Sequence, residues 1–152
     1  MNPWMAIAYD EALKGMETTE GGPFGAVIVR NNEVIARAHN EVLISHDPTA
    51  HAEILAIRRA SALLGKHDLS ECILYTTCYP CPMCLGAILW ARLSKVCYAS
   101  TTQEAAAAGF EDTHFYKALK HPKTAINLEV VDPETGKKLL YLWHIKEDKE
   151  FY

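Results

Sequence analysis

Two short motifs constrain this chain more than any other feature: His51–Ala52–Glu53 and Pro80–Cys81–Pro82–Met83–Cys84. Each motif lies where the sequence predicts the start of a helix. Cys81 and Cys84 are three residues apart, so they share a face on the first turn of a helix. The N-terminus of a helix also favours the thiolate form of cysteine, which is the form that binds metal. A fold that brings the two helix starts together would therefore create a metal site.

Around the motifs, the hydrophobic pattern predicts alternating helices and strands. The expected helices span about 4–17, 50–64, 80–92, 115–119 and 137–149, and the expected strands span about 24–29, 34–39, 72–77, 96–99 and 127–131. We expect Asp47 or Thr49 to cap the second helix. A helix separates the third strand from the fourth, which implies that these two strands pair in parallel within a layered α/β domain.

The composition suits one soluble domain over residues 1–152. Hydrophobic residues make up 49% of the chain and charged residues 22%, which is enough to bury one core. The formal net charge of −4 supplies no overall attraction to phosphate, so small molecules are favoured over nucleic acids as partners. No signal peptide is expected in residues 1–15, and the apolar stretch 85–91 is too short to cross a membrane. We therefore expect a cytoplasmic protein without a membrane partner.

His51, Cys81 and Cys84 form a ligand set of the kind that zinc prefers. Three protein ligands leave a fourth tetrahedral position for water, which is the arrangement of a catalytic rather than a structural zinc site. Zinc lowers the pKa of bound water to about 7. Glu53, two residues after His51, is placed to move a proton between that water and a leaving group.

The other cysteines allow a different interpretation of the site. Cys78 as a fourth ligand would close it and make it structural, and the protein would then be a zinc-stabilised binding module without catalysis. Glu53 would have no evident purpose in such a site. Cys81 and Cys84 could also be core thiols or a redox pair. Cys72 and Cys97 fall within apolar strands, where core packing explains them.

The H-x-E…P-C-x-x-C pattern is that of the zinc nucleobase deaminases, and the resemblance extends further. Four blocks are similar to bacterial guanine deaminases of the cytidine-deaminase-like superfamily: GGPFGAVIV at 21–29, DPTAHAE at 47–53, CILYTTCYPCPMCLGAILWAR at 72–92 and AAAGFEDTHFYK at 106–117. The terminal Phe151–Tyr152 is also similar to the end of that family. One departure is Tyr79, where the family commonly has glutamate.

The resemblance implies a three-layer α/β/α fold with a mixed five-stranded sheet, and zinc-dependent hydrolysis of guanine to xanthine and ammonia. It also implies a homodimer in which the C-terminal segment is exchanged between subunits. The roles that it implies for single residues are purine stacking by Phe24 and Trp90, binding of the base edge by Asn40, purine binding or proton relay by Asp112 with Glu111, and closure over a pocket by Tyr152. Each residue also has an ordinary structural interpretation: core packing for the two rings, a turn for the asparagine, a solvated loop for the acidic pair and a frayed end for the tyrosine.

A second candidate activity keeps the chemistry and changes the substrate to adenosine in transfer RNA. Such enzymes need a surface that attracts phosphate. In the C-terminal segment, the acidic residues Glu134, Glu147, Asp148 and Glu150 are balanced by Lys137, Lys138, Lys146 and Lys149. No basic stripe is evident, so a small purine remains the favoured partner, with guanosine, cytosine and related rings as alternatives.

Overall fold

The structure is a computed structural model that describes residues 2–152. Its elements are α1 (Pro3–Glu17), β1 (Gly25–Arg30), β2 (Glu33–His39), α2 (Val42–Ser45), α3 (Ala52–Leu64), β3 (Ile73–Cys78), α4 (Pro82–Trp90), β4 (Lys95–Ser100), α5 (Thr102–Ala107), α6 (Thr113–Lys120), the 3-10 helix η1 (Pro122–Thr124) and α7 (Pro133–Ile145). The chain divides into two compact units, the first ending at Asp112 and the second running from Thr113 to Tyr152.

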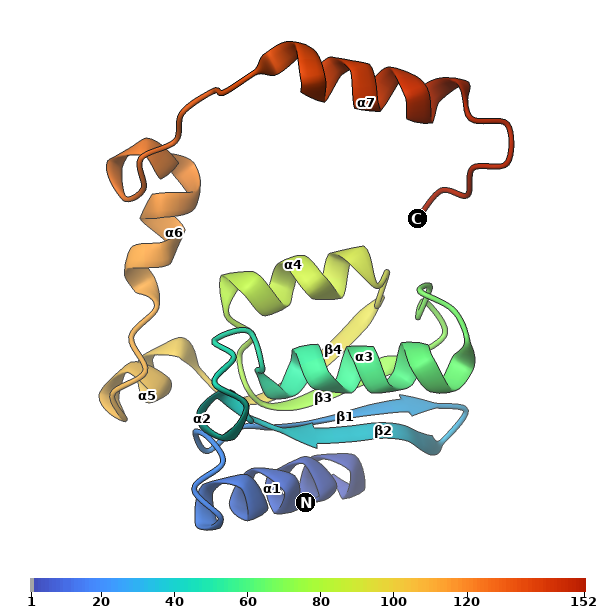
Figure 1. Cartoon of the computed structure of the whole chain (residues 1–152). Helices are drawn as coiled ribbons and strands as arrows, with labels where there is room; N and C mark the ends of the chain where they lie inside the picture. The colour runs from blue at the N-terminus through green and yellow to red at the C-terminus, as the bar shows by residue number, and fades with distance from the viewer. Residues whose placement is uncertain (1) are drawn as a thin grey trace. The chain divides into compact units, whose positions relative to one another are not determined.

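The first unit is built on a mixed sheet with the strand order β2-β1-β3-β4 (Figure 1). β1 pairs antiparallel with both β2 and β3, and β3 pairs in parallel with β4, as the intervening helix predicts. α1 covers one face of the sheet, and α3 and α4 lie on the other. The sheet therefore positions the starts of α3 and α4 on the same side.

Both faces of the central strand β1 are buried, which explains its unbroken apolar sequence. Successive side chains of a strand point to opposite faces, so Ala26 and Ile28 pack in the core cluster that includes α3, while Val27 and Val29 pack in the cluster on the α1 side. α3 contributes small residues at helical spacing to its cluster, namely Ala52, Ala56 and Ala60. These small residues allow the helix backbone to approach the sheet closely.

The second unit consists of α6, η1 and α7. α7 begins at Pro133, earlier than the expected residue 137, because proline suits the first turn of a helix and Asp132 precedes it. The apolar side chains of α7 are exposed, including Leu139, Leu142, Trp143 and Ile145. None of the helices in residues 2–152 combines the length and the apolar character that a membrane crossing requires.

The expected five-stranded sheet is wrong: the described residues form four strands. The segment 127–131, predicted to be the fifth strand, has no regular structure here. Its Ile, Leu and Val content gives it strand propensity, but a strand requires a hydrogen-bonded neighbour. No strand of the described chain pairs with it.

Candidate metal and active site

The loop before α3 presents the ring of His51. The predicted cap is wrong, because neither Asp47 nor Thr49 caps α3. Oδ1 of Asp47 instead accepts hydrogen bonds from the backbone N–H and the hydroxyl of Thr49, at 2.8 and 2.7 Å. This local turn leaves His51 as the N-cap residue of α3, in extended conformation and with no side-chain cap bond. The imidazole is therefore available to the site.

The start of α4 presents the two thiols. Cys81 is the N-cap residue in extended conformation, and Pro82 takes the first helical position as expected. Cys84 lies on the first turn and is fully buried. The loop that leads into α4 is tied to the next strand, because the N–H of Tyr79 donates to the carbonyl of Ser100 at 2.8 Å.

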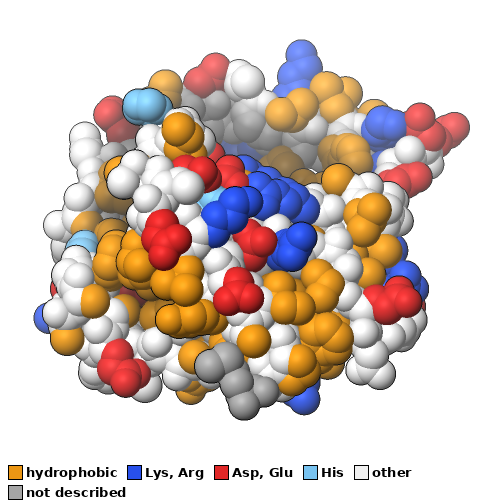
Figure 2. Space-filling view, turned by 90° about the horizontal axis from the view of Figure 1, so that it is seen from below, with side chains coloured by type: hydrophobic (Ala, Val, Ile, Leu, Met, Phe, Trp, Pro, Cys, Tyr) orange, Lys and Arg blue, Asp and Glu red, His pale blue; other side chains and the backbone are white. Residues whose placement is uncertain are grey.

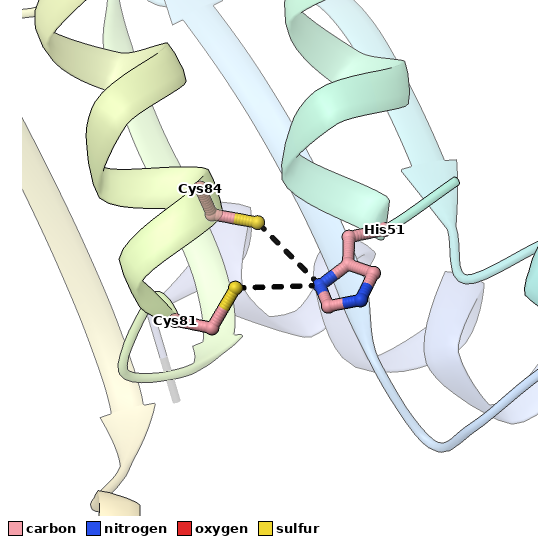
Figure 3. A group of neighbouring side chains, drawn as sticks. All are labelled: His51, Cys81 and Cys84. Atoms are coloured by element: carbon pink, nitrogen blue, oxygen red, sulfur yellow. Dashed lines mark hydrogen bonds between the residues drawn. The ribbon is translucent and has the colours of Figure 1, made fainter. Parts of the chain in front are cut away.

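The three predicted ligands meet in one place (Figure 3). Nδ1 of His51 lies 3.6 Å from Sγ of Cys81 and 3.6 Å from Sγ of Cys84, and the three candidate ligand atoms all lie within 4.8 Å of one another. Zinc bonds of about 2.3 Å to sulfur and about 2.0–2.1 Å to nitrogen, at a tetrahedral angle, imply an N···S separation of about 3.6 Å. The donor set and its spacing therefore fit a zinc ion.

The two cysteines of the cluster differ in protonation. A hydrogen bond from Cys84 lowers the pKa of Cys81 to about 4, and the neighbouring His51 adds to this effect. The same bond, together with burial, raises the pKa of Cys84. Hydrogen bonding to the Cys81 thiolate raises the pKa of His51. The cluster thus shares protons that a metal ion must displace when it binds.

Glu53 is buried in the first turn of α3, with 6% of its surface exposed. Its Oε1 accepts a hydrogen bond from the hydroxyl of Thr76 at 3.1 Å, and its Oε2 faces Sγ of Cys84 at 3.6 Å. Burial raises the pKa of Glu53, and the nearby Cys81 charge adds to the rise. A carboxyl group with a raised pKa beside a ligand cluster is suited to accept and return a proton.

Sequence reasoning missed Thr76, which holds Glu53 in place. Thr76 is fully buried on β3, on the face of the sheet toward α3. Threonine is common in strands, so its type gave no signal. Its position in the apolar run 72–77 could have raised the question, because a buried hydroxyl needs a partner.

Phe24 and Asn40 lie side by side where β1 begins and β2 ends. The N–H of Asn40 donates to the carbonyl of Phe24 at 2.9 Å. Oδ1 of the buried Asn40 accepts from the backbone N–H groups of Gly22 and Val42, at 3.4 and 3.1 Å. Phe24 also makes an edge-on contact with Phe110, with ring centroids 4.8 Å apart. Oδ1 of Asn40 is therefore committed to the backbone, whereas neither of these bonds uses its amide Nδ2.

The acidic pair lies at the end of the first unit. Asp112 is partly buried and Glu111 is exposed. Burial raises the pKa of the Cys78 thiol, and the charges of Glu53 and Asp112 raise it further, which places both carboxylates within electrostatic range of Cys78. Cys78 itself donates to the carbonyl of Thr101 at 3.9 Å. It is not a member of the ligand group, which keeps three protein ligands.

One of the predicted substrate residues of the first unit lies away from this cluster. Trp90 is 67% exposed at the last residue of α4, roughly 12 Å along the helix from its start at the rise of an α-helix. Tyr152 belongs to the second unit, where its side chain is 72% exposed. The remaining cysteines match their predicted roles: Cys72 is part of the core around α3, and Cys97 packs against the core on the α1 side.

An apolar cleft of about 640 Å³ opens on the α1 face of the sheet. Its lining includes the apolar residues Met5, Tyr9, Leu13, Met16 and Phe110. Apolar side chains gather on this side of the molecule (Figure 2). The lining includes Phe24 and Cys78, but none of the three ligand residues and not Glu53.

Comparison with known proteins adds to this geometry. Residues 2–100 match the family described as the cytidine and deoxycytidylate deaminase zinc-binding region. The chain is 54% identical to guanine deaminase of Bacillus subtilis over 111 residues, which are 73% of this chain and 71% of that protein. A crystal structure of guanine deaminase from Bacillus subtilis superposes with a TM-score of 0.90, at 43% identity, and covers 100% of both chains. The lower identity over the whole chain indicates that the remaining residues are less alike.

Two more distant relatives differ in the activity that their names give. A tRNA-specific adenosine deaminase of Aquifex aeolicus is 42% identical over 97 residues, 64% of each chain. A structure of guanine deaminase from Nitrosomonas europaea superposes with a TM-score of 0.67 at 31% identity, and covers 72% of this chain and 64% of that one.

Proposed function

The chain belongs to the cytidine and deoxycytidylate deaminase zinc-binding family, and we propose that it hydrolyses guanine to xanthine and ammonia. The observation that carries the proposal is the buried Glu53, held by Thr76 beside the three ligand atoms. The similarity to Bacillus subtilis guanine deaminase supports guanine over other aminated rings.

His51, Cys81 and Cys84 hold the zinc ion in this proposal. When bound, zinc supplies a water activated to hydroxide near neutral pH. Glu53 takes the proton of the attacking water through Oε2, the oxygen that faces the cluster, and returns it to a ring nitrogen of the purine. A second transfer, by Glu53 or by the Glu111–Asp112 pair, carries the remaining proton of the attacking water to the amino group, which leaves as ammonia while the attacked carbon becomes a carbonyl.

Phe24, Asn40 and Asp112 hold the purine in this proposal. The free Nδ2 amide of Asn40 donates a hydrogen bond to an acceptor on the base edge, since Oδ1 already serves two backbone N–H groups. The ring of Phe24, supported by Phe110, packs against the purine. Asp112 accepts from an N–H of the base, a contact for which its partly buried position near Cys78 gives support.

We further propose that the working protein is a homodimer with exchanged C-terminal segments, so that both units complete one deaminase domain. Apolar surface left exposed on each unit supports this assembly. The cleft on the α1 face is apolar, and so are the exposed side chains of α7. Trp90 and Tyr152, both largely exposed here, would then line a pocket that includes a second subunit. The cytoplasm is the proposed location.

The test is ammonia release by the zinc-loaded protein on guanine, guanosine, adenine, cytosine and cytidine, with a transfer-RNA substrate in parallel. Turnover of guanine well above the other substrates is expected. Turnover of transfer RNA without turnover of guanine would instead favour the editing activity that other relatives carry in their names. If the zinc-loaded protein released no ammonia from any of these substrates, the proposal would be contradicted.

A further inference from the structure

The imidazole of His39 is enclosed between α1 and the end of β2. The side chain is 5% exposed, with Nδ1 3.2 Å from Oε2 of Glu11 and Nε2 2.6 Å from Oε2 of Glu20. The ring packs so closely on α1 that a Cβ at Gly15 would come within 2.5 Å of it. Both ring nitrogens therefore face carboxylate oxygens at hydrogen-bond distance.

The two carboxylates hold the ring of His39 at both of its nitrogens. A carboxylate only accepts hydrogen bonds, so a ring nitrogen that carries a proton can donate to the carboxylate that it faces. The other charges around the group are Arg37, whose Nε lies 3.4 Å from Oε1 of Glu11, and Lys14, whose charge acts on Glu20.

Glu20 links His39 to the backbone around Asn40. The backbone carbonyl of Glu20 accepts from the N–H groups of Leu43 and Ile44, both at 3.0 Å. Two residues further on, the N–H of Gly22 donates to Oδ1 of Asn40. The loop is packed so tightly that a Cβ at Gly21 would lie 2.2 Å from that same oxygen. A shift of Glu20 therefore moves the groups that orient Asn40.

We propose that His39, which bridges Glu11 and Glu20, is a positioning residue that holds the amide of Asn40 against the purine edge. The inference rests on the proposed function, because it takes Asn40 as a base-binding residue. His39 does not touch the substrate and acts through the chain Glu20, Gly22 and Asn40. Loss of the bridge loosens substrate binding more than the chemical step.

A double-mutant cycle tests this coupling. His39→Gln is expected to raise the KM for guanine about tenfold, as loss of a charge-assisted hydrogen bond would, with kcat within about threefold of wild type. In an Asn40→Ala background the same substitution is expected to leave KM within about twofold, because the residue it positions is gone. An equal rise of KM in both backgrounds would overturn the proposal, as would a fall of kcat with KM unchanged.

Two further measurements keep the result interpretable. Glu20→Gln keeps the shape of the glutamate side chain but removes its charge, and it is expected to raise the KM for guanine as His39→Gln does. His121 is an exposed histidine in the second unit. His121→Gln is therefore the matched control and is expected to leave KM unchanged. An unchanged KM for Glu20→Gln would overturn the proposal, because the effect of His39 on Asn40 runs through Glu20.

Discussion

The hydroxyl of Thr76 donates a hydrogen bond of 3.1 Å to Oε1 of Glu53, from a strand to the first turn of a helix. Both side chains are buried, so water does not compete for this bond. The bond leaves Oε2 facing the ligand cluster. One oxygen of the carboxylate is thus fixed while the other remains free to move protons.

Replacement of Thr76 by valine removes this support and keeps the shape of the side chain. We expect kcat/KM for guanine to fall about tenfold, as for a lost hydrogen bond to a charged group, with zinc content unchanged. Thr77→Val is the matched control, since Thr77 accepts from the N–H of Gly25 and does not contact Glu53. Equal losses of activity in the two variants would show that Thr76 acts only through stability.

Replacement of Asn40 by aspartate tests which half of its side chain binds the purine. Aspartate can still accept from the N–H groups of Gly22 and Val42, but it has no amide to donate. We expect the KM for guanine to rise at least about tenfold while the melting temperature stays within a few degrees. An unchanged KM would mean that Asn40 Nδ2 does not bind the base.

Zinc binding is expected to release protons and to weaken as the pH falls. The raised pKa values of Cys84 and His51 mean that these groups keep their protons to higher pH than usual, and both must lose them to bind metal. Calorimetric titration of the metal-free protein with zinc, in buffers of different ionisation enthalpy, measures this release. Binding near neutral pH without proton release would contradict the proton-sharing cluster.

A charge on the apolar side of α7 is expected to disrupt the proposed dimer. Leu142→Glu places a carboxylate among exposed apolar side chains that would be buried by assembly. Light scattering should show a shift from dimer to monomer, with loss of guanine turnover. Lys138→Glu, on the same helix, is the control for added negative charge. A wild-type chain that is monomeric and fully active would refute the exchange.

The metal cluster was predictable from the sequence because its three ligands and Glu53 lie at the starts of two helices. At a helix start, the spacing of residues along the chain fixes which side chains share a face. The role of Thr76 could not be predicted, because threonine is common in strands and its type does not reveal the hydrogen bond to Glu53. The bridge around His39 joins residues 11, 20 and 39, and no short motif marks such a contact.

The secondary structure was predictable where local signals agree. Proline at position 82 marked the start of α4 correctly, whereas the start of α7 was missed although Pro133 gave the same signal. The segment 127–131 has the composition of a strand, but composition supplies no pairing partner. Its expected pairing was an inference from resemblance, and the sheet of this chain has four strands.

The measurement that tests the central claim most directly is guanine turnover by zinc-loaded Glu53→Gln. The amide keeps the size of the side chain and can still accept from Thr76, but it cannot take up a proton. We expect one zinc per chain, as in wild type, and a loss of kcat of about 10²–10⁴-fold, the usual contribution of a general acid–base group. Wild-type turnover by this variant, with zinc bound, would show that Glu53 is not the group that moves the proton.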